Sequence, residues 1–253
     1  MKKKPVSPRG TPAFTLVEVM ISMTIVVMVL GMAMSTYLFG LRTMYKDTQR
    51  LITNANLRYF VAQVSKETLD ATEFYIFPLY TKLDGNVDMA ADITTVTSDS
   101  YGTDIYHGDC LVLVTRVSLD TTAAIRQFRI YFRVVTNSNQ EGIIRYFESQ
   151  DYGSTGAMTS GTATPLATLL NGVNLNSNPA YAGTGTNRIL AQRARGRPTA
   201  SDPTVYYPIF SSELPTLSVT NESVSINVEI INGSTVNNLL SSSSFNYTIS
   251  PRR

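Results

Sequence analysis

The chain of 253 residues has one cysteine, one histidine and no tryptophan. Cys110 is the only cysteine, so no disulfide can form within the chain, and its neighbours Leu111 to Val114 predict a small buried residue in a strand. His107 is the only histidine, so a Ser-His-Asp arrangement would depend on it, and no Gly-x-Ser-x-Gly motif is present. Walker A and G-x-G-x-x-G motifs are also absent. These absences argue against an enzyme and against a nucleotide-driven motor.

Charge is missing from one long stretch near the start of the chain. From Val19 to Leu41 there are 23 consecutive uncharged residues, dominated by Leu, Met, Val and Ile. About 20 such residues in a helix cross the roughly 30 Å hydrocarbon core of a bilayer, so the stretch predicts a single membrane span. Residues 1–13 contain four basic residues and no acidic residue. A basic flank of this kind is typical of the cytoplasmic side of a span.

One acidic residue, Glu18, stands at the edge of this apolar stretch. A carboxylate inside a span costs about 2.5–3.5 kcal/mol at the centre and less near an end, so a retained one suggests a function and a partner. The surrounding residues read Ala13, then Phe14-Thr15-Leu16-Val17-Glu18. This string resembles the cleavage and methylation motif of type IV prepilins, in which a small residue, usually Gly, precedes Phe-Thr-Leu-x-Glu. The chain departs from that pattern at Ala13.

The resemblance is firm over residues 1–45 and implies how the start of the chain is processed. Residues 1–13 would be a leader peptide, removed by a prepilin peptidase between Ala13 and Phe14, and the new amine of Phe14 would be methylated. Cleavage after Gly10 would instead leave Glu18 at the eighth position of the mature chain rather than the fifth.

The resemblance also implies a partner for Glu18, namely the N-terminal amine of Phe14 on a neighbouring subunit. Opposite charges in a low-dielectric bundle attract strongly, and each is costly alone, so the pair would favour one filament register. Implied partners are other pilin or pseudopilin subunits, the peptidase, an inner-membrane assembly platform and, before assembly, lipid. Alternatively, Glu18 marks the headgroup boundary of an ordinary single-span anchor.

The remaining chain divides into a helix and a β-rich part. Residues 14–70 lack proline, and apolar residues beyond position 41 recur at spacings of three and four, which predicts one continuous helix with a buried stripe. Residues 14–41 would be its transmembrane or filament-core part. Residues 71–253 predict an extracytoplasmic domain of antiparallel sheet, and the whole an α+β, pilin-like fold. Expected strands are Cys110–Val117, Ile125–Val135, Gly142–Glu148, Val205–Phe210, Val224–Ile231 and Phe245–Ile249.

Two polar segments, 81–109 and 151–187, are expected to be loops. Within the first, Asp84, Asn86 and Asp88 alternate like the ligands of a calcium loop, but the glycine and glutamate that complete such a loop are absent. A calcium site there is the weaker alternative to a solvated acidic loop, and no other cofactor is expected. A basic cluster without interleaved aromatic residues argues against nucleic-acid binding, and it comprises Arg188, Arg193, Arg195 and Arg197.

These observations favour a structural protein of the inner membrane over an enzyme. The length of the chain and its closing strand pair resemble minor pilins and the J-type minor pseudopilins of type II secretion. The chain would insert in the membrane, lose its leader, and join or prime a pilus or pseudopilus. The alternative is a filament-tip module whose polar loops bind an adhesive ligand, an exoprotein or DNA. The sequence does not separate a pilus from a secretion pseudopilus.

Overall fold

The computed structural model describes residues 15–77, 79–80, 96–98, 104–120, 122–135, 141–171, 173, 185–196, 206–214, 223–232 and 241–249. The chain divides into two compact units, Met1–Thr48 and Gln49–Arg253. A long helix and a large antiparallel sheet place the fold in the α+β class, as the sequence predicted.

Helix α1 runs from Leu16 to Asp70, and its last residue is the one that the sequence predicted. Every described residue of the first unit, from Thr15 to Thr48, has an exposed side chain. Hydroxyl groups in this part donate to the carbonyl oxygen four residues earlier, as Thr24 does to Met20 at 2.8 Å and Thr36 to Met32 at 3.0 Å. Such bonds satisfy polar groups inside the helix itself, which a span in hydrocarbon requires.

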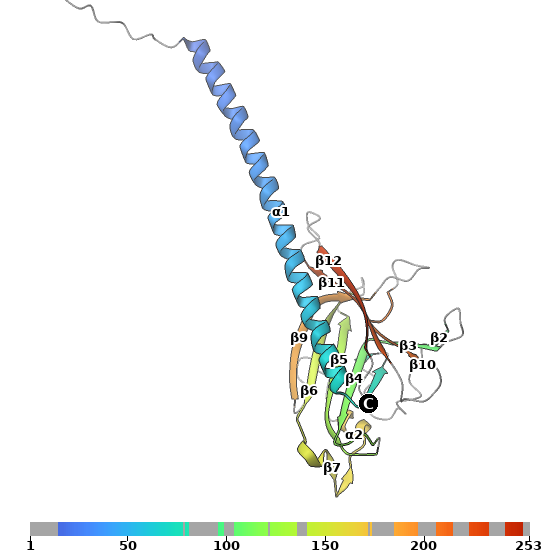
Figure 1. The fold of residues 1–253 in the computed structure, drawn as a ribbon. Helices are drawn as coiled ribbons and strands as arrows, with labels where there is room; N and C mark the ends of the chain where they lie inside the picture. Colours follow the sequence, from blue (N-terminus) through green and yellow to red (C-terminus); the bar gives the residue numbers. More distant parts are fainter. Residues whose placement is uncertain are drawn as a thin grey trace, which may run out of the picture. The chain divides into compact units, whose positions relative to one another are not determined.

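Within the second unit, the last turns of α1 lie on one face of the sheet (Figure 1). The buried side chains of the helix follow spacings of three and four, and they are Thr53, Leu57, Phe60, Val61, Val64 and Thr68. The predicted stripe was therefore right at four positions of this set. The other predicted positions were wrong, because their side chains are exposed, and they are Leu41, Met44, Leu51, Ala55 and Leu69. Thr53 and Thr68 complete the buried track instead.

The sheet has ten strands, and every recorded pairing in it is antiparallel. Its main path connects β1 (Glu73–Phe77), β4 (Cys110–Arg116), β5 (Ile125–Val135), β6 (Gly142–Ser149), β9 (Gly185–Arg195), β11 (Val224–Asn232), β10 (Phe210–Leu214), β3 (Asp104–Gly108) and β2 (Val96–Ser98). Strand β12 (Ser241–Ile249) pairs with β11 outside this path, which confirms the predicted pair near the end of the chain.

Side chains alternate between two cores on opposite faces of the sheet. In β5, Tyr131 packs in the core that includes α1, whereas Ile130 and Phe132 pack in the second core. The second core is covered by the short helix α2 (Leu166–Asn171) through Leu166 and Leu170. Because both faces are covered, the central strands read as nearly continuous apolar runs.

Several polar segments hold more structure than the sequence indicated. The expected loop 81–109 contains β2 and β3, and the expected loop 151–187 contains a 3-10 turn (Gly153–Thr155), the hairpin β7 (Met158–Thr159) and β8 (Thr162–Ala163), α2 and the start of β9. The strand expected at Val205–Phe210 is wrong, because β10 begins at Phe210. Proline at position 208 has no N–H for a ladder, and the N–H of Ile209 donates to Asp109 Oδ1 at 3.1 Å.

Two glycines allow backbones to pass closely at the rim of the sheet. A Cβ on Gly108, at the end of β3, would lie 2.1 Å from the carbonyl oxygen of Phe77 at the end of β1. A Cβ on Gly196, just after β9, would lie 1.6 Å from the carbonyl oxygen of Tyr207. Any larger residue at either position would force the two segments apart.

Candidate assembly and anchoring site

The start of α1 carries a reciprocal pair of hydrogen bonds between Thr15 and Glu18. The backbone N–H of Thr15 donates to Glu18 Oε2 at 3.0 Å, and the N–H of Glu18 donates to Thr15 Oγ1 at 3.3 Å. The Thr15 hydroxyl also donates to Glu18 Oε2 at 3.1 Å. This arrangement is a capping box, which satisfies backbone donors that have no partner inside the helix. The carboxylate is therefore held at the first turn of α1 and remains exposed.

The capping box was missed by the sequence reasoning, which considered Glu18 only as a charge. The signal was present, since Thr-x-x-Glu directly precedes a long apolar run. Of the other residues expected at this site, Ala13 and Phe14 lie outside the described residues. The expected cleavage between them stays a prediction.

Beyond the cap, the first unit presents an unbroken apolar surface. Leu16 is 77% exposed, Met23 69% and Phe39 72%, and the residues between them are exposed as well. Among the helices that the structure describes, α1 is long and apolar enough to cross a membrane. Exposed apolar surface on this scale in water is unfavourable, so the helix needs lipid or other helices around it.

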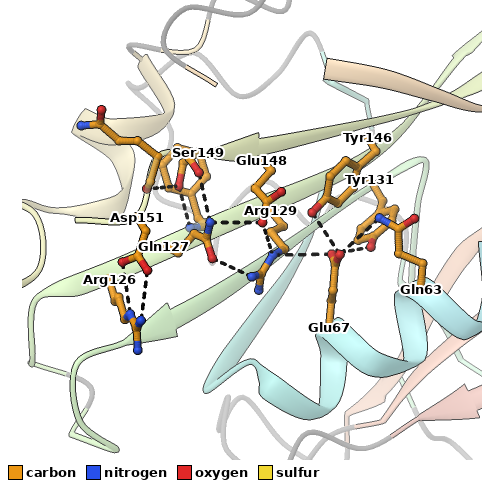
Figure 2. A network of polar contacts seen from close by, with 12 residues as sticks. Gln63, Glu67, Arg126, Gln127, Arg129, Tyr131, Tyr146, Glu148, Ser149 and Asp151 are labelled. Carbon is orange, nitrogen blue, oxygen red and sulfur yellow. Dashed lines mark hydrogen bonds and ion pairs between the residues drawn. The ribbon is translucent and has the colours of Figure 1, made fainter. Parts of the chain in front are cut away.

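At the other end of α1, a polar network joins the helix to the sheet inside the second unit (Figure 2). The carboxylate of Glu67 accepts a short hydrogen bond from the hydroxyl of Tyr131 on β5 and a 3.0 Å bond from the hydroxyl of Tyr146 on β6. Gln63, one turn earlier, donates to Glu67 Oε1 at 3.2 Å. Arg129 Nε lies 3.7 Å from Glu67 Oε2. One helix side chain therefore contacts two neighbouring strands.

Arg129 continues the network away from the helix, along β5 and β6. Its Nε donates to Glu148 Oε1 at 3.1 Å, and its Nη2 donates to Gln127 Oε1 at 2.6 Å. Gln127 in turn donates to Glu148 Oε1 at 3.1 Å and to the carbonyl of Ser149 at 3.2 Å. Figure 2 shows these side chains following one another across the two strands. Connected donors and acceptors of this kind hold each other in one arrangement.

Burial controls the protonation of the two tyrosines in this network. It raises the pKa of Tyr131 and of Tyr146 well above the ordinary tyrosine range, and the negative charge of Glu67 raises both further. Both hydroxyls therefore stay protonated and act as donors. The rings add packing, since Tyr131 contacts Phe60 of α1 edge to face with ring centroids 6.3 Å apart.

Two ion pairs fix the sheet around this anchor. Arg116 of β4 binds Glu73 of β1 with Nε and Oε1 2.7 Å apart. Arg133 of β5 binds Asp109 with Nη2 and Oδ2 2.6 Å apart, and both side chains are almost fully buried. Removing one member of a buried pair leaves an uncompensated charge, so these contacts hold the strand order rigidly.

The basic cluster on β9 is partly neutralised by acidic residues. Arg193 pairs with Glu141 at 2.9 Å and Arg195 with Glu229 at 2.7 Å. The guanidinium of Arg188 lies over the ring of Tyr146, 4.6 Å from its centroid. Arg197 lies outside the described residues. Two of the described members are therefore paired with acidic side chains, and the third stacks on a tyrosine.

The remaining candidate residues are the cysteine, the histidine and the three residues of the possible calcium loop. Cys110 is fully buried in β4, as predicted, and burial raises the pKa of its thiol well above the usual value. His107 was expected in a polar loop but belongs to β3, where its ring stacks on Tyr207 with centroids 5.6 Å apart and burial lowers its pKa. Asp84, Asn86 and Asp88 lie outside the described residues. Within the described part of the chain, no group of three potential metal ligands occurs.

The chain matches no family model, no curated protein and no solved structure. The helix and the sheet themselves define the class of protein. This is an α+β protein in which one capped apolar helix, long enough to cross a membrane, is joined to an antiparallel sheet.

Proposed function

We propose that this chain is a minor pilin or minor pseudopilin, a non-enzymatic subunit that inserts in the inner membrane and then joins a filament through α1. The observation that carries the proposal is the combination at the start of α1. An exposed carboxylate, Glu18, stands in the first turn of the helix. The residues that follow it are uncharged as far as Leu41, and their side chains are exposed as far as Thr48. A helix cap could use an uncharged glutamine at this position, so the charge supports a role beyond the cap.

The capping box supports a dual role for Glu18. In the isolated chain the carboxylate accepts hydrogen bonds from Thr15, one residue after Phe14. It is therefore held beside the place where processing would create a new amine. In a bundle of such helices, a neighbouring amine would supply the positive charge that the carboxylate lacks in lipid. Lipid would cover the apolar surface of α1 before assembly, and other helices would cover it afterwards.

The anchor at Glu67 supports the same proposal from the other end of the helix. A subunit pulled from a bilayer into a filament needs a firm connection between its helix and its outer domain. Glu67, Tyr131 and Tyr146 supply that connection with hydrogen bonds between α1 and two central strands. We propose that residues 71–253 form the extracytoplasmic domain carried by this helix.

The test compares Glu18→Ala with Glu18→Gln in cells that produce the filament. Glutamine also serves in a capping box, so it keeps the helix cap and removes only the charge. Both variants are expected to insert in the membrane normally, and both are expected to fall at least about tenfold in the sheared filament fraction, because neither can pair with an amine.

The readout is the ratio of the chain in the filament fraction to the chain in the membrane fraction, measured by immunoblot. If Glu18→Gln enters filaments like the unchanged chain while Glu18→Ala does not, the acid serves only as a cap. If both enter normally, the proposed assembly role of Glu18 is wrong.

A further inference from the structure

Strand β12 forms a long edge of the sheet. Its pairing with β11 extends over nine residues, from Val224 opposite Ile249 to Asn232 opposite Ser241. Among the residues that the structure describes, β11 is the only strand paired with β12. In an antiparallel pair, about half of the backbone N–H and C=O groups of an edge strand point away from its neighbour. These groups can accept another strand.

The sequence of β12 lacks the features by which edge strands usually prevent such pairing. Ser241–Ile249 contains no charged residue and no proline, whereas edges are commonly protected by lysine, proline or a very short length. The edge strand β2 has three residues. The edge strand β1 has five, and its Glu73 is engaged by Arg116. Of the described edges, β12 is therefore the longest and carries no charge.

The two faces of β12 differ in chemistry. Exposed hydroxyl and amide groups line one face, from Ser242, Ser244, Asn246 and Thr248. On the other face, Phe245 packs partly against the core and Tyr247 is 41% exposed, with the two ring centroids 5.7 Å apart. The apolar core thus reaches the edge, and no further strand among the described residues pairs with β12 beyond it. A further strand that alternates in the same way would cover both rings.

We propose that β12 pairs antiparallel with β12 of a second copy of this chain. Phe245 is the midpoint of Ser241–Ile249, so pairing about this residue places Phe245 opposite its own copy and residue 243 opposite residue 247. Both copies then keep their aromatic residues on one face and their hydroxyl and amide groups on the other. No like charges meet, and cross-strand aromatic contacts stabilise such pairs. The contact is two-fold symmetric and self-complementary.

This contact goes beyond the proposed function and does not depend on it. Neighbours in a helical filament are related by a screw operation, which a two-fold contact does not satisfy. The β12 pair would therefore join chains in the membrane before assembly, or chains of two adjacent filaments. Its failure would leave the assembly role of Glu18 untouched, and the Glu18 variants should not change the β12 pair.

The experiment measures the oligomeric state of the full chain in detergent by sedimentation, with Asn246→Lys as the test variant and Gln192→Lys as the control. Asn246 is exposed on β12, and Gln192 is exposed on β9, which is paired on both sides. Asn246→Lys places the two new lysines diagonally across the two-fold axis on one face, each opposite Ser244 of the other copy, and is expected to weaken the dimer by about threefold to fivefold. Gln192→Lys should leave it within about twofold.

A synthetic peptide with the sequence of residues 241–249 serves as the probe of the edge. It should dissociate the dimer, and the same peptide with methylated backbone nitrogens should not, because it lacks the donors. A monomeric chain at all concentrations overturns the proposal, even where the peptide binds, since the edge then takes a strand of a different protein. A dimer that resists both Asn246→Lys and the peptide overturns it too, because that dimer forms elsewhere.

Discussion

At the scale of single residues, Glu67 connects the helix to the sheet. Its carboxylate accepts hydrogen bonds from Tyr131 and Tyr146, whose side chains are almost completely buried. Hydrogen bonds to a charged group contribute more than neutral ones, and a buried donor left without an acceptor is costly. The sequence did not indicate this contact, because Glu67 is separated from Tyr131 by 64 residues and from Tyr146 by 79.

Replacing Glu67 by alanine should therefore destabilise the second unit by about 3 kcal/mol, since it leaves two buried tyrosine hydroxyls without their acceptor. Urea unfolding of the full chain in detergent, followed by circular dichroism, measures the change. Lys66→Ala is the matched control, because Lys66 is exposed on the neighbouring position of α1 and its loss should cost less than about 0.5 kcal/mol. Equal effects of the two substitutions would contradict the anchoring role.

The buried tyrosines also predict how stability depends on pH. Burial, with the added charge of Glu67, raises the pKa of Tyr131 and Tyr146, and burial beside Glu73 raises the pKa of Tyr75 to about 12. The unfolded chain releases these protons near pH 10, while the folded chain retains them. Their contribution is therefore fully present below about pH 10 and is lost as the pH rises further.

We expect the free energy of unfolding to fall above pH 10 by about 1.4 kcal/mol per pH unit for each retained tyrosine proton. Tyrosinate absorbance reports the ionisation without a tryptophan contribution, and the difference between the chain and its Tyr131→Phe variant isolates that residue among the 14 tyrosines. Tyr131→Phe should be less stable at neutral pH but should lose stability less steeply above pH 10. An unchanged slope in that variant would show that Tyr131 ionises in the folded chain.

At the scale of elements, the buried track of α1 in the second unit is narrower than its apolar residues indicate. Phe60 is fully buried and contacts the ring of Tyr131, whereas Leu51 is 70% exposed. Phe60→Ala should therefore cost about 3–5 kcal/mol through lost burial and a cavity. Leu51→Ala should cost less than about 0.5 kcal/mol by the same urea measurement. Similar losses at both positions would mean that Leu51 also faces the core.

The sequence predicted elements well where pattern and burial agree. The bounds of β5 were predicted correctly, because the strand is rich in β-branched and aromatic residues. The end of α1 at Asp70 was also predicted correctly, because apolar residues recur at spacings of three and four up to that point. The prediction failed at Val205–Phe210, where Pro208 prevents a ladder, and in polar segments such as Asp104–Gly108, whose pairing partners lie far along the chain. Pairing between distant segments leaves no local periodicity.

Residues of the candidate site could likewise be predicted only where a local motif surrounds them. Glu18 could be found from the sequence because a motif surrounds it, and its cap with Thr15 could have been found from Thr-x-x-Glu. The Glu67 network could not be found, since each member looks ordinary in its own segment. The basic residues Arg193 and Arg195 seemed to form a cluster, but Glu141, just before β6, and Glu229 of β11 bind them.

At the scale of the whole molecule, the chain consists of two units that differ in whether their apolar side chains are exposed or buried. The unit Met1–Thr48 exposes apolar side chains throughout its described part, whereas the unit Gln49–Arg253 buries its apolar residues in two cores. Exposed apolar surface on the scale of the first unit is unfavourable in water and is stabilised by contact with lipid or with other helices. The proposed function assigns lipid to the precursor and other subunits to the processed chain.

Removal of the leader is the step that would convert the precursor in lipid into the processed chain that joins other subunits. The position of the cleavage site therefore tests the proposal most directly. The full chain in membrane vesicles is incubated with a prepilin-type peptidase and a methyl donor, and the mass of the product is measured. We expect a chain that begins at Phe14, lacks residues 1–13 and carries one methyl group on its new amine. An intact chain that begins at Met1, or cleavage after Gly10, would contradict the proposed pairing of Glu18 with the amine of Phe14.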